Sequence, residues 1–177
     1  MDMLTALHTR RSVRRFLPTP VGDDKVRVLL EAAMIAPSAG NGQPWQFVVV
    51  TDPALLQQAG DINPYGAMAK NAPLGILVCG DARLEKYPDH SFWVQDCSAA
   101  MQNLLLAVVD QGLGAVWTGL YPMQERVDGF KKLVHLPEYI TPLGFAIIGY
   151  TDVEQTSKSR FREDRVHYNR WNEQVTF

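Results

Sequence analysis

The stretch Arg10-Arg11-Ser12-Val13-Arg14-Arg15-Phe16 places four arginines and a serine within six positions near the N-terminus. Guanidinium groups bind phosphate oxygens in pairs, and a serine hydroxyl adds a further donor. In an extended segment alternate side chains share a face, so Arg10, Ser12 and Arg14 would point the same way. The stretch predicts an anion site. A solvated charge run or a nucleic-acid contact is an equally good interpretation of this segment by itself.

A second stretch of interest is Ala36-Pro37-Ser38-Ala39-Gly40-Asn41-Gly42-Gln43-Pro44-Trp45, which has the composition of a loop. Its small residues would let the backbone approach a flat ligand closely. Ser38, Asn41 and Gln43 offer donors and acceptors for such a ligand. The alternative is an ordinary connection between a helix and a strand, with Trp45 in the core.

The third stretch, Gly112-Leu113-Gly114-Ala115-Val116-Trp117-Thr118-Gly119-Leu120-Tyr121-Pro122, does not fit the glycine fingerprint of dinucleotide-binding folds. The third glycine is out of place, and the segment leads from a helix into a strand, which is the reverse order. A nicotinamide site of that type is therefore not indicated. Gly119 at a strand end would instead allow the backbone to contact a ring system.

The chain ends in a polar segment, 151–177, which carries a second basic cluster at Lys158-Ser159-Arg160. A compact domain seldom has so long a segment without regular structure. Its isolated aromatic side chains need a surface on which to bury, and a partner subunit would provide one. The alternative is a loose or locally packed tail. The aromatic residues in question are Phe161, Tyr168, Trp171 and Phe177.

Apolar spacing predicts alternating helices and strands along the rest of the chain. Asp23 or Asp24 would cap the second helix, and Asp52-Pro53 would begin a third. Helix 92–111 is apolar over a wide arc, which is typical of a helix buried in a core or an interface. The predicted elements are a short helix near the N-terminus, helices from 26 to 34, after 53, from 92 to 111 and from 123 to 134, and strands 47–51, 75–80, 115–118 and 143–150.

Length and composition limit the class of protein. A chain of 177 residues suits one domain, or one subunit of an intimate dimer. A net charge of -2 argues against a general nucleic-acid or membrane-surface binder. No apolar run approaches the roughly 20 residues of a membrane-spanning helix, and no signal core begins the chain, so a cytoplasmic protein is expected. Cys79 and Cys97 are expected to be buried thiols, and no metal site is predicted.

Taken in order, the four stretches resemble the nitroreductase family of FMN enzymes, and the resemblance covers nearly the whole chain. It implies an α+β fold in which a mostly antiparallel central sheet is packed with helices. Residues 1–177 would form a single FMN-binding domain, with 151–177 as an extended C-terminal arm. The arm would lie on the partner in a domain-swapped homodimer, and FMN would bind at the dimer interface.

The resemblance also implies which residues hold the cofactor. Arg10 and Ser12 would contact the phosphate and the ribityl chain, and Arg14 would lie near the pyrimidine edge of the flavin. Arg160, with Lys158 as a further candidate, would complete a phosphate clamp. The full set of expected cofactor-binding residues is Arg10, Arg11, Ser12, Arg14, Pro37, Ser38, Ala39, Asn41, Thr118, Gly119, Lys158 and Arg160.

The flavin ring would receive residues from both subunits. The loop from Pro37 to Asn41 would come from the other subunit and cover the ring, while Thr118 and Gly119 would meet it near N5. Many relatives carry a small polar residue where this chain has Ala39, so a contact there would involve backbone only. A further ligand before the second strand is poorly matched, and the three candidates for it stay open. They are Asn63, Tyr65 and Lys70.

The implied activity is that of an FMN-dependent oxidoreductase. Hydride would pass from NADH or NADPH to flavin N5 and then to an electron-poor acceptor such as a nitroaromatic or a quinone, with ping-pong kinetics. No protein nucleophile or base is required, so no catalytic side chain is predicted. Related flavin chemistry is one alternative, namely dehalogenation, dehydrogenation or flavin fragmentation. The other is a non-enzymatic anion-binding module, which the net charge and scattered aromatics do not support.

Overall fold

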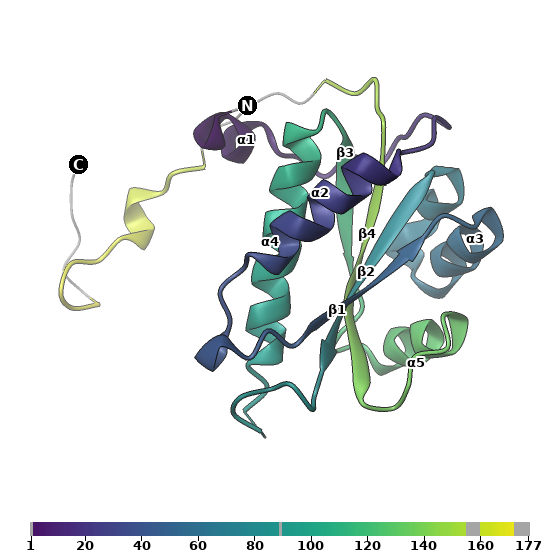
Figure 1. Cartoon of the computed structure of the whole chain (residues 1–177). Helices are drawn as coiled ribbons and strands as arrows, with labels where there is room; N and C mark the ends of the chain where they lie inside the picture. The colour runs from purple at the N-terminus through teal and green to yellow at the C-terminus, as the bar shows by residue number, and fades with distance from the viewer. Residues whose placement is uncertain (1, 89, 155–159, 172–177) are drawn as a thin grey trace.

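Capping side chains set where several helices begin. We describe the fold from a computed structural model, which covers residues 2–88, 90–154 and 160–171 (Figure 1). Asp2 accepts the backbone N–H of Thr5 at 3.1 Å, and Asp52 accepts that of Ala54 at 2.7 Å. The helices are α1 (Met3–Thr9), α2 (Asp23–Met34), α3 (Pro53–Ile62), α4 (Trp93–Asp110) and α5 (Gln124–Leu133), with 3-10 turns η1 (Ala39–Asn41), η2 (Pro64–Asn71) and η3 (Glu163–Arg165).

The expected cap of α2 was wrong. Gly22 occupies the N-cap position, and no side chain caps the helix there. Asp23 and Asp24 lie inside the first turn instead. Carboxylates in the first turn stabilise a helix through its dipole, so both residues still favour a helix start at this point.

The strands form one antiparallel sheet in the order β1-β2-β4-β3. β2 and β4 lie in the middle and are buried almost throughout, which explains their nearly continuous apolar sequences. The predicted antiparallel sheet with packed helices is confirmed. Its strands are β1 (Trp45–Val50), β2 (Leu74–Asp81), β3 (Gly114–Gly119) and β4 (Ile140–Gly149).

Helices cover both faces of the sheet. Figure 1 shows α2 and α4 on one face and α3 and α5 on the other. Alternation along β2 divides the core accordingly, because Ile76 packs with Met101 of α4 while Leu77 packs with Phe130 of α5. Cys79 and Cys97 are both buried and free, as expected.

An extended segment joins α1 to the sheet. Ser12 forms a parallel bridge with Ala115 of β3, and the N–H of Val13 donates to the Ala115 carbonyl at 2.8 Å. Val13 is buried, whereas Ser12 and Arg14 are exposed. The predicted alternation is present from Ser12 to Arg14, where Val13 alone is buried, but it does not separate Arg10 from Arg11, which are both partly buried, and Arg15 is exposed.

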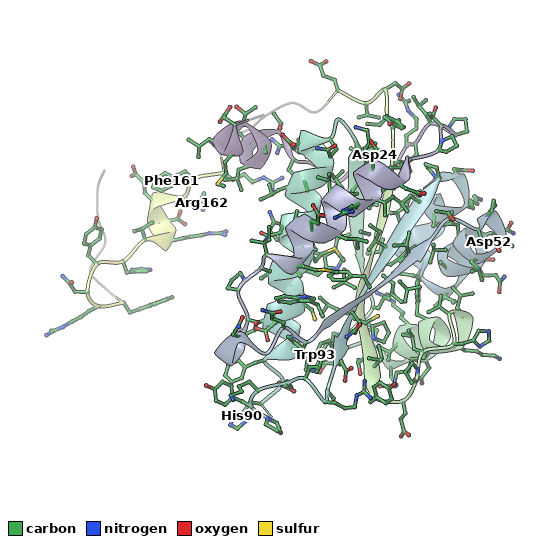
Figure 2. All side chains as sticks on the ribbon, viewed as in Figure 1. Asp24, Asp52, His90, Trp93, Phe161 and Arg162 are labelled. Carbon is green, nitrogen blue, oxygen red and sulfur yellow. The ribbon has the colours of Figure 1, made fainter. Side chains whose placement is uncertain are left out.

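Residues 150–154 lead away from the sheet, and residues 160–171 lie on the far side of α1 from the sheet (Figure 1). Figure 2 shows Phe161 and Arg162 standing well away from the body of the subunit. Trp171 and Phe161 are 79% and 60% exposed in this single chain. Lys158 lies outside the described residues. No helix among those described is long and apolar enough to span a membrane.

Candidate functional site

Arg10, at the end of α1, lies near enough to Arg11 and to Arg160 of the C-terminal segment for their charges to act on it. Burial, followed by the neighbouring charges of Arg160 and Arg11, lowers the pKa of Arg10 below its ordinary value. Arginine nevertheless keeps its proton in proteins. The three guanidinium groups, which we call the arginine cluster, therefore concentrate positive charge at a partly buried place.

The arginine cluster has no acidic partner among the residues that the structure describes. Nη1 of Arg11 donates to the carbonyl of Arg10 at 2.7 Å, but its Nη2 is buried without a hydrogen-bond partner there. Other arginines are paired with carboxylates, as Arg15 is with Asp152 at 2.8 Å. A buried donor without a partner destabilises the fold by about 1–3 kcal/mol. This arrangement fits a site that an anion completes.

The end of β3 offers an open backbone surface. A Cβ at Gly119 would meet no atom within 4 Å, so a flat group could approach the chain there. The Gly119 carbonyl accepts from Nδ2 of Asn63 at 3.2 Å and from Nη1 of Arg126 at 3.1 Å, which fixes the peptide. Thr118 is buried, and its hydroxyl donates to the Phe145 carbonyl at 3.0 Å. Any contact of Thr118 with a ligand must therefore be made by its backbone.

The structure separates the three candidates that precede β2. Asn63 is buried, and its Oδ1 accepts the N–H of Tyr65 at 3.1 Å, so both ends of its amide are used inside the chain. Tyr65 is 71% exposed and lies under the guanidinium of Arg126. Lys70 lines a cavity together with Arg14. Of the three, Lys70 is the side chain available to a ligand near the arginine-rich segment.

The loop from Pro37 to Asn41 is held in an unusual backbone conformation. Asn41 and Gln43 adopt φ values of 55° and 48°, which non-glycine residues rarely adopt. Oδ1 of Asn41 accepts from Nε2 of Gln43 at 2.9 Å, and Oγ of Ser38 accepts from the Gln43 N–H at 3.0 Å. Residues in such conformations persist where the surroundings impose them, and they cluster at functional sites.

Asp96, which lies outside this loop on α4, holds the loop in place through a hydrogen bond. Its buried carboxylate accepts the N–H of Ala39 at 2.9 Å. The N–H of Ala39 is therefore already used within the chain. Sequence reasoning missed Asp96, although a carboxylate on an otherwise apolar helix face was a usable signal.

One chain does not bring the loop and the arginine cluster together. Asp96 holds the loop at the N-terminal end of α4, while Ser12 pairs with Ala115 just beyond its C-terminal end. At 1.5 Å per residue the 18 residues of α4 span about 27 Å. A mononucleotide is shorter than this distance. If the loop from Pro37 to Asn41 and the arginine cluster contact the same mononucleotide, they must come from two copies of the chain.

Comparisons with known proteins agree on one family. The sequence pattern of the nitroreductase family matches residues 7–63 and 62–150. A protein of Methanothermobacter thermautotrophicus, provisionally named NADH dehydrogenase/NAD(P)H nitroreductase, is 44% identical over 171 residues. The match covers 97% of this chain and 88% of that protein.

Solved structures show the same fold. A provisionally named NADH dehydrogenase/NAD(P)H nitroreductase of Parabacteroides distasonis superposes with a TM-score of 0.90 at 38% identity, covering 96% of this chain and 98% of that one. A nitroreductase-like protein of Desulfovibrio desulfuricans, solved in complex with FMN, gives a TM-score of 0.77 at 30% identity and covers 92% of each chain.

Proposed function

Since this chain belongs to the nitroreductase family, we propose that it is an FMN-dependent NAD(P)H oxidoreductase acting on electron-poor acceptors such as nitroaromatics and quinones. The observation that carries the proposal is the arginine cluster. Arg10, Arg11 and Arg160 gather charge without an acidic partner in the described chain, and Nη2 of Arg11 is a buried donor without an acceptor. A phosphate group would supply both the negative charge and the acceptor oxygens.

Ser12, Arg14 and Gly119 would contact the parts of FMN other than its phosphate group. Ser12 is exposed beside the arginine cluster and can donate to the phosphate or the ribityl chain. Arg14 lies two residues further along the extended segment and would approach the pyrimidine edge of the flavin. The open surface at Gly119 leaves room for the isoalloxazine ring. Bound FMN would supply hydride acceptance from NAD(P)H at N5 and its delivery to the second substrate.

In this proposal the side chains orient the flavin and stabilise its negative charge, and none of them reacts chemically. A cation such as Arg14 would favour negative charge at the pyrimidine end of the ring. The Gly119 peptide is fixed by Asn63 and Arg126, so its position does not have to be organised during the reaction. No protein nucleophile or base is needed, and successive use of one ring face by donor and acceptor predicts ping-pong kinetics.

A homodimer completes the site in this proposal. The loop from Pro37 to Asn41 would cover the flavin held by the arginine cluster of the other copy. Exposed apolar side chains support such an assembly, because Ile35 and Met3 are 79% and 75% exposed in the single chain. Residues 151–177 would be a C-terminal arm of one domain, laid on the partner so that Phe161 and Trp171 are covered.

Spectroscopy of the purified protein tests the proposal. We expect a yellow protein with one FMN for each chain. Stopped-flow mixing with NADH or NADPH should bleach the flavin band, and a panel of nitroaromatics, quinones and halogenated phenols should restore it at different rates. Colourless protein that takes up no added FMN would refute the function, and a ternary complex on the pathway would refute the ping-pong order.

A further inference from the structure

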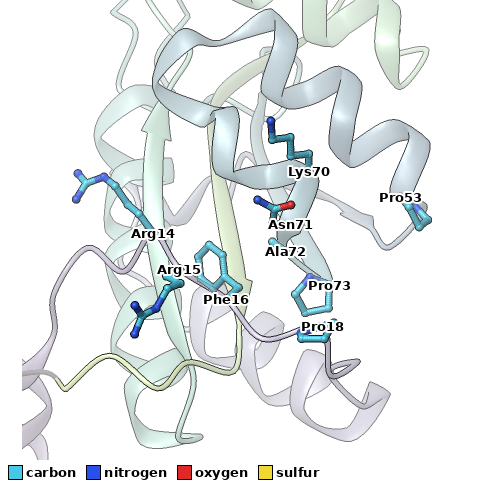
Figure 3. A pocket seen from close by; sticks show the side chains of 9 residues that line it. All are labelled: Arg14, Arg15, Phe16, Pro18, Pro53, Lys70, Asn71, Ala72 and Pro73. Carbon is cyan, nitrogen blue, oxygen red and sulfur yellow. The ribbon is translucent and has the colours of Figure 1, made fainter.

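A cavity of about 580 Å³ opens beside the flavin site proposed above (Figure 3). The segment from Arg14 to Phe16 forms one side of it, and Lys70 and Asn71 at the end of η2 form the other. Its volume lies within the usual range of small-molecule sites. Arg14 belongs both to this cavity and to the edge of the proposed flavin site, so the two spaces adjoin.

The lining of the cavity is cationic. Among the described residues it includes Arg14, Arg15 and Lys70 and no acidic residue. Arg15 is already paired with Asp152 at 2.8 Å. Arg14 and Lys70 have no acidic partner among the described residues. Arg14 and Lys70 are thus cations without counterions among the described residues, and they lie on opposite sides of the cavity, with the amide of Asn71 next to Lys70 and the guanidinium of Arg14 directed away from Lys70 (Figure 3).

The walls of the cavity are fixed by the fold. Phe16 lines the cavity and is itself buried, and the N–H of the next residue, Leu17, donates to the Tyr150 carbonyl at 2.8 Å. Pro73 lines the opposite wall, and its ring restricts the backbone there. A cavity that exists before binding requires little ordering of the protein when a ligand enters.

We propose that this cavity binds a phosphate group of the NAD(P)H donor while the nicotinamide lies against the flavin beyond Arg14. The inference rests on the proposed function. Nitroaromatic and quinone acceptors need carry no charge, whereas every nicotinamide dinucleotide carries a diphosphate, and NADPH carries a further phosphate on its ribose. Arg14 and Lys70 match this anionic class of ligand in charge and in donor chemistry.

The test uses the FMN-loaded enzyme and three reductants. Wild type, Lys70→Gln and Lys70→Glu are mixed in a stopped-flow instrument with NADPH, with NADH and with 1-benzyl-1,4-dihydronicotinamide, which has no phosphate. Lys132→Gln is the matched control, because Lys132 is exposed on α5 and does not line the cavity. FMN content is measured first for every variant.

We expect Lys70→Gln to raise the apparent Kd of a phosphate-bearing donor by about tenfold, the scale of one lost charge-assisted hydrogen bond. Lys70→Glu should raise it further, and the phosphate-free donor should be unaffected. A loss confined to NADPH identifies the 2′-phosphate as the bound group, and a loss with both dinucleotides identifies the diphosphate.

Three results would contradict the proposal that this cavity binds a phosphate group of the donor. They are an equal loss for all three donors, no loss for any donor, and loss of FMN from the Lys70 variants, which would place Lys70 at the flavin instead. A wild-type enzyme that binds FMN but is reduced by none of the donors would refute the proposed function itself.

Discussion

The carboxylate of Asp96 accepts a hydrogen bond from the backbone N–H of Ala39 at 2.9 Å, and this contact joins residues 57 positions apart in the sequence. Asp96 lies in the first turn of α4, and Ala39 begins η1. The core helix of the subunit thereby sets the position of the loop that we propose to cover a partner's flavin. Asp96 is a positioning residue in this account.

Removing this contact should loosen the loop. Asp96→Ala leaves the Ala39 N–H without its acceptor, so we expect a loss of about 1–3 kcal/mol in unfolding free energy and weaker FMN binding. Asp96→Asn keeps an acceptor oxygen and should retain most of the FMN affinity. FMN titrations and denaturant unfolding measure both effects, with Gln95→Ala on the exposed side of α4 as the control. Equal FMN affinity in Asp96→Ala and wild type would exclude the positioning role.

Two glycines should respond to substitution in opposite ways. A Cβ at Gly119 would have no atom of the described residues within 4 Å, so Gly119→Val should fold normally and yet lose FMN, because the added side chain takes the space of the ring. A Cβ at Gly75 would overlap the ring of Phe145, so Gly75→Ala should lower the unfolding free energy by about 1–3 kcal/mol. Thermal melting and FMN content separate the two effects. Normal FMN content in Gly119→Val would contradict the placement of the ring.

Mixed dimers test whether the site is shared between chains. Arg10→Glu disables the arginine cluster, and Asn41→Trp obstructs the loop, so neither variant alone should hold FMN. Co-expression with two different tags and purification of the heterodimer should recover one intact site in each dimer. Heterodimers that stay free of FMN, while tagged wild-type pairs bind it, would show that each site lies within one chain.

An acid-stability prediction follows from Asp81. Hydrogen bonds from Arg83, at 3.0 and 2.8 Å, lower the pKa of the buried Asp81 carboxyl. A carboxyl with a lowered folded pKa stabilises the fold above its unfolded pKa, and that stability is lost as pH falls through the folded value. Arg83→Met removes the main cause of the lowered pKa, so acid unfolding should begin at higher pH.

Circular dichroism during acid titration measures this shift. Arg162→Met is the control, because its partner Asp164 is exposed on the C-terminal segment and not in the core. An identical acid midpoint for wild type and Arg83→Met would contradict the role given to the Asp81 pair.

Sequence periodicity was enough to predict the four strands and the long helix α4. Their boundaries moved by no more than a few residues, because burial of alternating or i, i+4 side chains determines such elements locally. The eight-residue turn η2 was not predicted. Its residues, Pro64–Asn71, show no strong apolar spacing, and the turn is anchored by Asn63, whose side chain reaches the Gly119 carbonyl far away in sequence.

The candidate site was predictable where a local rule applied. The exposure of Ser12 and Arg14 on either side of the buried Val13 followed from strand geometry, since only Val13 needed burial. The contacts of Asp96 and the internal hydrogen bond of Thr118 depend on tertiary packing, which no local pattern encodes. The proximity of Arg160 to Arg10 likewise joins the two ends of the chain.

The phosphate clamp is tested most directly by comparing FMN with riboflavin, which lacks the phosphate. The Kd of each flavin is measured by fluorescence quenching for wild type, Arg10→Ala, Arg160→Ala and the control Arg162→Ala. We expect Arg10→Ala and Arg160→Ala each to weaken FMN binding by about 1.5–3 kcal/mol and to leave riboflavin binding unchanged. Unchanged FMN affinity in both variants, or an equal loss for FMN and riboflavin, would contradict the assignment of the arginine cluster to the flavin phosphate.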